Sequence, residues 1–275
     1  MTHGTSSTPD YTMGFGHEFV ETMRRFTAQK NAAYLLPYLR PGLRILDFGC
    51  GPGTISVGLA QAVSPGELYG VDMEESQIDL ARSVAEAAGQ TNTIFQVADV
   101  ADLPFEDDYF DVAHCHNVLM HVPDTEAVLA EVMRVLKPGG IIGCREMICE
   151  SSFTVPDFGI LRKAWDMFED ILATDDAHPQ MGKELKDRLI KAGFANIRMN
   201  ATFDMFDSAE EIEFIYRLVY AWFLSPSLRE QAIGYGVTTR KLADDIAVAY
   251  ERWRRDPGAL LAVGYGEAIA NKPFS

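Results

Sequence analysis

The sequence predicts an α/β protein built on a mostly parallel sheet with helices on both faces. Apolar strand-like runs alternate with segments of helical periodicity through the middle of the chain, an alternation typical of parallel sheets. A glycine-rich turn follows the first apolar run, and acidic residues follow the next two runs. Because parallel strands end at one edge of a sheet, these features are expected to meet in a single crevice.

Each element follows from a local pattern, with glycine and proline marking the breaks. In order, we expect a strand at 44–48, a glycine turn at 49–53, a helix at 54–63, a strand at 68–71, a helix at 76–89, strands at 93–97 and 110–114, a helix at 125–136, a turn at 137–140 and a strand at 140–147.

The second half of the chain is richer in helices and aromatic residues. Helical patterns cover 157–174, 182–192, 208–224 and 237–255, and strand patterns cover 195–206 and 259–270, which brings the sheet to seven strands. We interpret the helices between the late strands as insertions that cap the substrate. The expected organisation is a disordered tail at 1–10, a helical lid at 11–40 with its helix at 16–36, a cofactor-binding core at 41–150, and a sheet-completing part with cap helices at 151–275.

Composition narrows the class of protein. The apolar share of 47% suits a globular core, and the chain contains no uninterrupted apolar run long enough for a membrane span. The first ten residues lack the apolar region of a secretory signal, so a cytoplasmic protein is expected. The net charge of −16 disfavours a nucleic-acid substrate, since phosphate backbones are repelled. The basic segment 252–255 is flanked by acidic residues and is interpreted as a solvated helix face.

The cysteine pattern points to free thiols. The four cysteines form no CxxC pair, and three of them lie in or beside apolar runs, which is typical of buried thiols in a reducing compartment. Tetrahedral zinc spacing and a carboxylate cluster for Mg²⁺ are both missing, so no metal is expected.

The most informative motif runs from Ile45 to Gly53, where an apolar strand enters a GxGxG turn that opens a helix. Glycine allows close approach of backbone to ligand, and a helix N-terminus favours an anionic group. Thr54 breaks the GxGxxG pattern of dinucleotide-binding proteins. Asp72 ends the second strand 19 residues after Gly53 and can accept hydrogen bonds from ribose hydroxyls, while Asp99 can accept from an adenine amino group. The alternative is a set of unrelated turns, each with its own capping aspartate.

The segments LDFGCGPG, VDMEESQIDLA, VADVADLPFEDDYFDVAHCHNVLMHVPD and VLKPGG, taken in this order, resemble the UbiE/MenG-like class I methyltransferases over residues 40–150. This resemblance implies the Rossmann-like class I methyltransferase fold, S-adenosylmethionine as cofactor and S-adenosylhomocysteine as product. GCREM and the terminal GYGEAI add a likeness to natural-product methyltransferases, including indole C-methyltransferases.

The resemblance also implies a cofactor site. Gly49, Gly51 and Gly53 are assigned to the methionine end, Asp72 to the ribose, and Asp99 with Val100 to the adenine. The remaining assigned cofactor contacts lie beside these motifs, after the fourth strand or in the lid: Asp47, Met73, Gln77, His116, Asn117 and Tyr11.

Methyl transfer from a sulfonium is an in-line displacement that requires close placement of the nucleophile and exclusion of water. Glu146 and His121 are the expected catalytic residues if the acceptor must lose a proton. Alternatives stay open for both: Glu146 could form an ion pair with Arg145 or Arg162, and His121 could be a turn residue.

Aromatic residues suggest a flat, apolar acceptor, although packing within the cap explains the same spacing. The expected substrate contacts are Tyr11, His17, Trp165, Tyr216 and Tyr220. We therefore expect methyl transfer to a small aromatic metabolite, with carbon favoured and an indole-type precursor as one candidate. Two alternatives keep the fold: a cofactor-bound cyclase or isomerase, and a non-catalytic cofactor-binding module. The lid helix could cross to a second subunit, so a homo-oligomer stays open.

Overall fold

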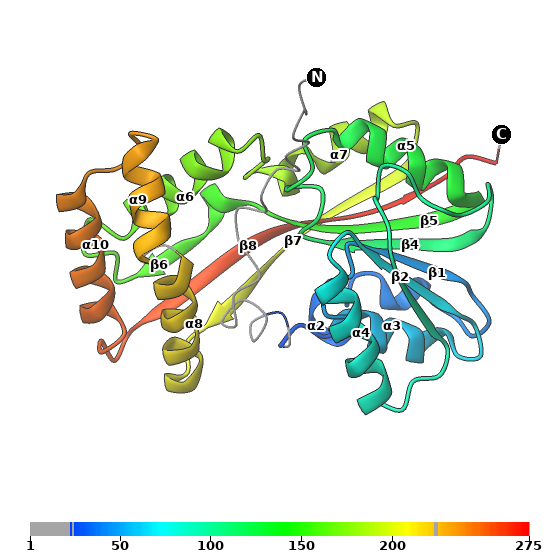
Figure 1. Cartoon of the computed structure of the whole chain (residues 1–275), viewed down its shortest axis with the longest axis horizontal. Helices are drawn as coiled ribbons and strands as arrows, with labels where there is room; N and C mark the ends of the chain where they lie inside the picture. The colour runs from blue at the N-terminus through cyan, green and yellow to red at the C-terminus, as the bar shows by residue number, and fades with distance from the viewer. Residues whose placement is uncertain (1–22, 24, 223–224, 275) are drawn as a thin grey trace, which may run out of the picture.

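The computed structural model describes residues 23, 25–222 and 225–274. Its centre is one mixed sheet in the order β3-β2-β1-β4-β5-β8-β6, with β7 also paired to β8 (Figure 1). The strands are β1 (Ile45–Phe48), β2 (Leu68–Asp72), β3 (Thr93–Val97), β4 (Phe110–His116), β5 (Leu136–Met147), β6 (Phe153–Val155), β7 (Ala195–Phe206) and β8 (Leu260–Asn271).

The first five strands, β1 through β5, pair with their sheet neighbours in parallel, as predicted. Strand β8 runs antiparallel to its neighbours. Both β6 and β7 pair with Leu261 and Ala262 of β8, so they lie on opposite sides of that strand. The three-residue β6 therefore continues the line of β5, and the sheet is seven positions wide. This confirms the predicted Rossmann-like architecture and adds one short strand to it.

Helices cover both faces of the sheet. α2 (Ala28–Asn31), α3 (Thr54–Val63) and α4 (Glu75–Ala87) lie on one face, and α5 (Thr125–Val135) and α7 (Met181–Lys191) lie on the other (Figure 1). Each face has its own apolar cluster: Ile45, Leu59 and Ile78 belong to one, and Val128, Leu129 and Leu185 to the other. Burial on both sides explains the nearly continuous apolar character of the central strands.

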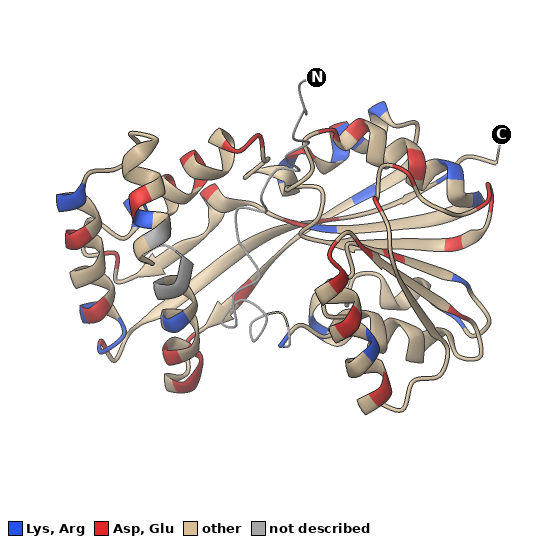
Figure 2. Cartoon of the chain, in the orientation of Figure 1, with Lys and Arg blue, Asp and Glu red and all other residues tan. Residues whose placement is uncertain are grey.

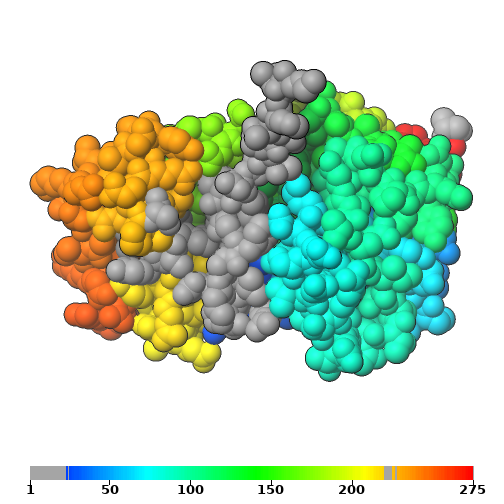
Figure 3. All heavy atoms as spheres, in the orientation of Figure 1, coloured from blue at the N-terminus to red at the C-terminus, as the bar shows by residue number. Residues whose placement is uncertain are grey.

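A group of helices surrounds the far ends of β7 and β8. It comprises α6 (Arg162–Thr174), α8 (Ala209–Trp222), α9 (Pro226–Gly234) and α10 (Arg240–Trp253). These helices lie at the opposite end of the molecule from β1–β3 (Figures 1 and 3). We call them the cap.

Local departures from the predicted elements have identifiable causes. Helical structure in the described part of 16–36 is confined to α2 and to the start of a 3₁₀ turn at Leu36–Tyr38, apart from Met23. Asn31 accepts a hydrogen bond from the Thr27 amide (3.0 Å), which favours a short capped turn over a continuous helix. The expected turn at 137–140 is an irregularity inside β5, where the pairing register with β4 shifts between Phe110 and Val112. Helix α9 was not expected.

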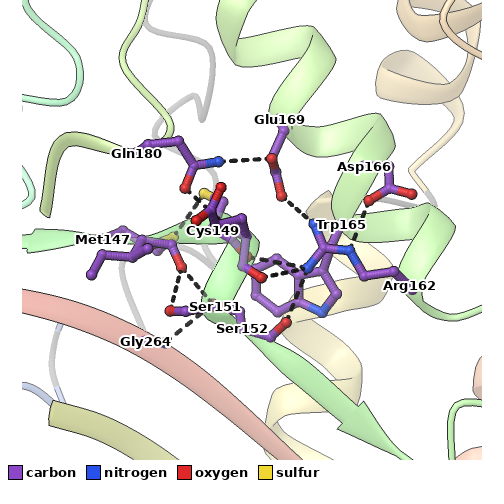
Figure 4. A network of polar contacts seen from close by, with 12 residues as sticks. Met147, Cys149, Ser151, Ser152, Arg162, Trp165, Asp166, Glu169, Gln180 and Gly264 are labelled. Atoms are coloured by element: carbon purple, nitrogen blue, oxygen red, sulfur yellow. Dashed lines mark hydrogen bonds and ion pairs between the residues drawn. The ribbon is translucent and has the colours of Figure 1, made fainter. Parts of the chain in front are cut away.

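Arg162 fixes the cap to the sheet (Figure 4). Its guanidinium donates to the carbonyl oxygens of Glu150 (3.1 Å) and Ser152 (3.2 Å), which lie between β5 and β6. It also pairs with Asp166 (2.7 Å) and Glu169 of its own helix. One planar group with several donors thus joins the first cap helix to the segment that follows β5.

Charges of both signs are interspersed over the cap helices (Figure 2). In the basic segment, Arg254 pairs with Glu213 (3.1 Å) and Arg255 pairs with Glu251 (3.0 Å), in keeping with a solvated helix face. Within the described ranges, no helix has the length and apolar character needed to cross a membrane. The same ranges contain no group of three or more His, Cys, Asp or Glu side chains arranged to hold a metal ion.

Close packing of α7 on β8 generates a stability prediction. A methyl group added at Gly266 would clash with the carbonyl oxygen of Gly182 and lie 2.8 Å from the Gly182 Cα. We expect Gly266→Ala to lower the free energy of unfolding in urea by about 1–3 kcal/mol, since the two backbones must separate. Gly234→Ala, with no atom within 4 Å of the added methyl, is the control. Equal unfolding curves for the two variants would contradict the prediction.

Candidate cofactor and acceptor site

The glycine turn between β1 and α3 adopts backbone conformations that favour glycine. Gly49, Gly51 and Gly53 have φ of +66°, +51° and +74°. A side chain at Gly49 would clash with Val118, and one at Gly53 would lie 2.8 Å from the Ala81 Cβ. Gly53 precedes α3 and provides no side-chain cap, so amides of the first helical turn are open to an anionic group. The carboxylate of a bound amino-acid moiety suits this position.

Asp72 connects the ends of the first two strands. Its Oδ2 accepts from the Gly51 amide (2.9 Å) and its Oδ1 from the Glu74 amide (3.1 Å). Burial raises the pKa of this carboxyl group, and the two backbone amides oppose the shift. A carboxylate has further lone pairs after two such bonds, so Asp72 can still accept from ribose hydroxyls. The neighbouring Met73 side chain is 60% exposed and offers an apolar surface next to it.

Asp99 and Val100 follow β3 at the same edge. Asp99 is exposed, and its Oδ1 accepts from the Ala101 amide (2.8 Å), while Val100 packs against the core. Register pairs Asp72 with Val97, which brings the residues after β3 next to Asp72. Gln77 is buried in α4 and its Oε1 has no hydrogen-bond partner. The structure thus brings the glycine turn, Asp72 and Asp99 to neighbouring strand ends, as the sequence predicted.

The placement of Asp47 does not fit the expected direct cofactor contact. Its side chain is buried, and its oxygens are bound by the Ser56 hydroxyl (2.5 Å) and the His114 Nδ1 (2.8 Å). These partners lie on α3 and β4. Asp47 therefore joins β1 to α3 and to β4. A buried carboxylate needs such hydrogen-bond partners.

Glu146 on β5 is completely buried, and its carboxylate binds the chain that follows β4. Oε1 accepts from the Val118 (3.0 Å) and Leu119 (2.9 Å) amides, and Oε2 accepts from the Met120 amide (3.1 Å). Val118 in turn lies against Gly49. We infer that Glu146 positions this loop and does not act as the general base expected from sequence, because both of its oxygens already accept hydrogen bonds from the loop amides.

The expected ion-pair alternatives for Glu146 are not formed either. Arg145 pairs with Asp204 (3.1 Å) and Glu267 (3.2 Å), and Arg162 pairs with carboxylates of its own helix. Burial raises the pKa of Glu146 to about 7, and the hydrogen bonds from the loop amides limit the shift.

Two histidines lie on or next to this loop. His121 is half-buried, and burial lowers its pKa to about 4, so it is neutral at pH 7 and a weak proton acceptor. His116 ends β4, where burial and then the Arg145 charge hold its pKa well below the usual value. Its ring meets Phe26 edge-on (5.0 Å between centroids) and tilts against Tyr265 (5.6 Å).

Two of the expected substrate contacts lie in cap helices and are buried with partners of their own. Trp165 is buried and donates to the Thr154 hydroxyl (3.4 Å), and Tyr216 is buried with its hydroxyl bound to Glu251. Neither fits the expected wall of an acceptor pocket. Tyr220 lies in α8, and its side chain is outside the described part, as are Tyr11 and His17 entirely.

Sequence reasoning missed residues that reach the site from distant parts of the chain. The Met23 carbonyl oxygen accepts from the Thr54 hydroxyl (2.8 Å) at the start of α3, and Phe26 covers His116. Tyr265 comes from β8, near the end of the chain. Met23 and Phe26 carry no motif, although they lie within the expected lid, and Tyr265 lies in the GYGEAI segment, where no role was predicted for it.

A sheet of this order with a glycine turn and an acidic residue after the second strand defines a nucleotide-cofactor enzyme of the Rossmann-like class. Residues 39–193, more than half of the chain, match the family described as "Methyltransferase domain", and the chain belongs to this family. It is a class I, S-adenosylmethionine-dependent methyltransferase.

Known proteins agree with this assignment. An uncharacterized methyltransferase of Schizosaccharomyces pombe is 29% identical over 95% of this chain and 96% of its own. A demethylmenaquinone methyltransferase of Staphylococcus aureus is 33% identical over 59% of this chain and 72% of its own. The crystal structure of the YcgJ protein of Bacillus subtilis superposes with a TM-score of 0.62 at 17% identity, covering 89% of this chain and 99% of that one, and so shares the fold.

The raised pKa of Glu146 predicts a pH dependence of stability. A glutamate with a pKa of about 7 when folded and about 4.3 when unfolded takes up a proton on folding between these values. Wild-type stability should therefore fall relative to Glu146→Gln as pH rises through this window, by at most about 1.4 kcal/mol per pH unit. Urea unfolding from pH 4.5 to 8 measures the difference, with the exposed Glu126→Gln as control. A difference independent of pH would contradict the buried, raised-pKa state.

Proposed function

We propose that this methyltransferase transfers the methyl group of S-adenosylmethionine in line to a small aromatic metabolite, with carbon as the favoured acceptor atom and an indole-type precursor as the leading candidate. The observation that carries the proposal is the meeting of two surfaces at the end of β4. Val118 lies against Gly49 of the glycine turn, and His116, two residues earlier, contacts the rings of Phe26 and Tyr265. Aromatic side chains of this kind line most small-molecule sites.

The cofactor would lie along the strand ends. Open amides at the start of α3 fit the methionine carboxylate, Asp72 fits the ribose hydroxyls, and Asp99 with Val100 fits the adenine. Bound there, the sulfonium supplies an activated methyl group. The chain itself has to orient the acceptor and exclude water.

No strongly basic side chain is required in this scheme. Glu146 holds the loop by its three amide contacts, and His121 is neutral at pH 7. Catalysis would rest on placement of an electron-rich ring carbon against the methyl group. Two further points favour a small acceptor: the relative named for demethylmenaquinone and the net charge of −16, which disfavours nucleic acid.

Cofactor placement can be tested at Asp72. Asp72→Ala should weaken S-adenosylmethionine binding by about 1.5–3 kcal/mol, because hydrogen bonds to a charged acceptor are lost. Asp79→Ala is the matched control, since Asp79 is exposed on α4 and pairs with Arg82. Calorimetric titration of both variants measures the effect. Unchanged affinity in Asp72→Ala would show that the adenosyl group binds elsewhere.

The acceptor class can be tested with methyl-labelled S-adenosylmethionine and a panel of indoles, phenols and quinones. We expect label on a ring carbon of one panel class, located by NMR of the isolated product. Heat-denatured enzyme and a reaction without acceptor are the controls. Label recovered mainly in protein or nucleic acid would refute a small-molecule acceptor, and label on oxygen or nitrogen alone would refute carbon methylation.

A further inference from the structure

A buried polar cluster lies on the sheet face beneath Phe26, where β4, β5 and β8 are adjacent. Register places His116 beside Arg145 and Arg145 beside Glu267. The Arg145 side chain is 1% exposed and pairs through Nε with Glu267 (3.2 Å) and through Nη2 with Asp204 (3.1 Å). Together with Asn117 and Tyr265, these residues form what we call the Arg145 cluster.

The two carboxylates of the cluster are well supplied with donors. Glu267 accepts from the Thr202 hydroxyl (2.8 Å) and from the side-chain Nδ2 of Asn200 (3.0 Å) in addition to Arg145. Asp204 accepts from the Asn31 side chain at 3.5 Å. Both carboxylates of the ion pairs therefore have hydrogen-bond partners within the chain.

Other atoms of the cluster are buried without any hydrogen-bond partner. They are Nη1 of Arg145, both ring nitrogens of His116 and Oδ1 of Asn117. Buried polar groups in proteins are almost always paired, so several orphans on adjacent residues call for an explanation. An exchangeable ligand that reaches this point supplies one.

These unpaired atoms gather around Tyr265. The Arg145 guanidinium lies 3.6 Å from the centre of the Tyr265 ring, and the His116 ring centre lies 5.6 Å from it. Asn117 directly precedes Val118, which lies against the glycine turn. The unpaired atoms are therefore next to the expected cofactor site, on the side of β5 and β8.

The chemistry of the cluster selects the charge of the ligand group. One guanidinium faces two carboxylates, so a carboxylate or phosphate on the ligand would meet excess negative charge. An ammonium group would be attracted by the same negative charge, but it is a donor only and would leave the donor Nη1 of Arg145 unpaired. A neutral amide avoids both penalties: its oxygen accepts from Nη1, and its N–H donates to Asn117 Oδ1 or to a nitrogen of neutral His116.

We propose that the Arg145 cluster binds a neutral amide, either a carboxamide or a lactam, carried by the methyl acceptor. This proposal rests on the proposed function, since it names a feature of the same acceptor. The amide would fix the orientation of the aromatic ring relative to the cofactor. An acceptor without the amide would leave the buried atoms of Arg145, His116 and Asn117 unpaired.

The test compares indole probes that differ only in the polar group. Indole-3-acetamide, indole-3-acetate, tryptamine and 3-methylindole are titrated calorimetrically into the full chain, with and without S-adenosylhomocysteine. We expect the acetamide to bind at least about tenfold more tightly than each of the others, a difference of one good hydrogen bond to a charged donor. Equal affinities, preference for the acetate or the amine, or no binding by any probe would overturn the proposal.

Two substitutions locate the preference. His116→Phe keeps the ring between Phe26 and Tyr265 but removes both nitrogens, and Asn117→Gly removes Oδ1 while tolerating the φ of +54°. Each should reduce the preference for the acetamide. Asn196→Gly, also at positive φ (+55°) but exposed on β7, is the matched control and should keep it. A preference that survives both cluster substitutions would mean that the unpaired atoms hold only internal water.

Cofactor binding separates this proposal from the proposed function. S-adenosylhomocysteine is titrated alone into the wild type and each variant, and thermal unfolding checks that each variant folds. Cofactor binding without an amide preference would refute only the Arg145 cluster as an amide site. Failure of the folded wild type to bind S-adenosylhomocysteine would refute the placement of the cofactor.

Discussion

The site depends on one buried carboxylate. Glu146 accepts hydrogen bonds from successive amides of Val118, Leu119 and Met120, and so fixes the loop after β4 at the point where it meets the glycine turn. Burial disfavours the charged form of Glu146 and raises its pKa. The hydrogen bonds from the three loop amides oppose this effect by stabilising the carboxylate. If this loop moved, the boundary between the cofactor side and the acceptor side of the crevice would move with it.

The two sides of that boundary are built in different ways. On the proposed cofactor side, the glycine turn, Asp72 and Asp99 all lie at or just after the end of a parallel strand, so they are brought together by neighbouring strands. On the proposed acceptor side, Phe26, Arg145 and Tyr265 come from three distant segments that only the completed sheet brings together. Long pairing between β7 and β8 and the Arg162 contacts hold the cap beyond them.

This difference explains which features could be predicted from sequence. The seven longer strands, the helices of the core and the convergence of Gly51 with Asp72 follow from periodicity and from the common edge of parallel strands, and they were predicted correctly, whereas the short β6 was not. The partners of Asp47 and Glu146 within the chain were not predicted, because a carboxylate beside a glycine turn or near a strand end looks the same whether it binds a ligand or a buried group of the protein. For Trp165 and Tyr216 both alternatives stayed open, since helical spacing of aromatics does not say which face is covered, and the structure has both side chains buried.

The same reasoning explains why the acceptor is the hardest property to read. A cofactor with fixed chemistry requires particular residues at particular strand ends, whereas an acceptor can be matched by any combination of groups from β4, β5, β8 and the segment near Phe26. What constrains the acceptor here is physical: unpaired donors and acceptors in the Arg145 cluster carry an energetic penalty unless a ligand pairs with them. The specificity of this methyltransferase is therefore better sought in the polar atoms that its fold leaves unpaired than in the motifs of its sequence.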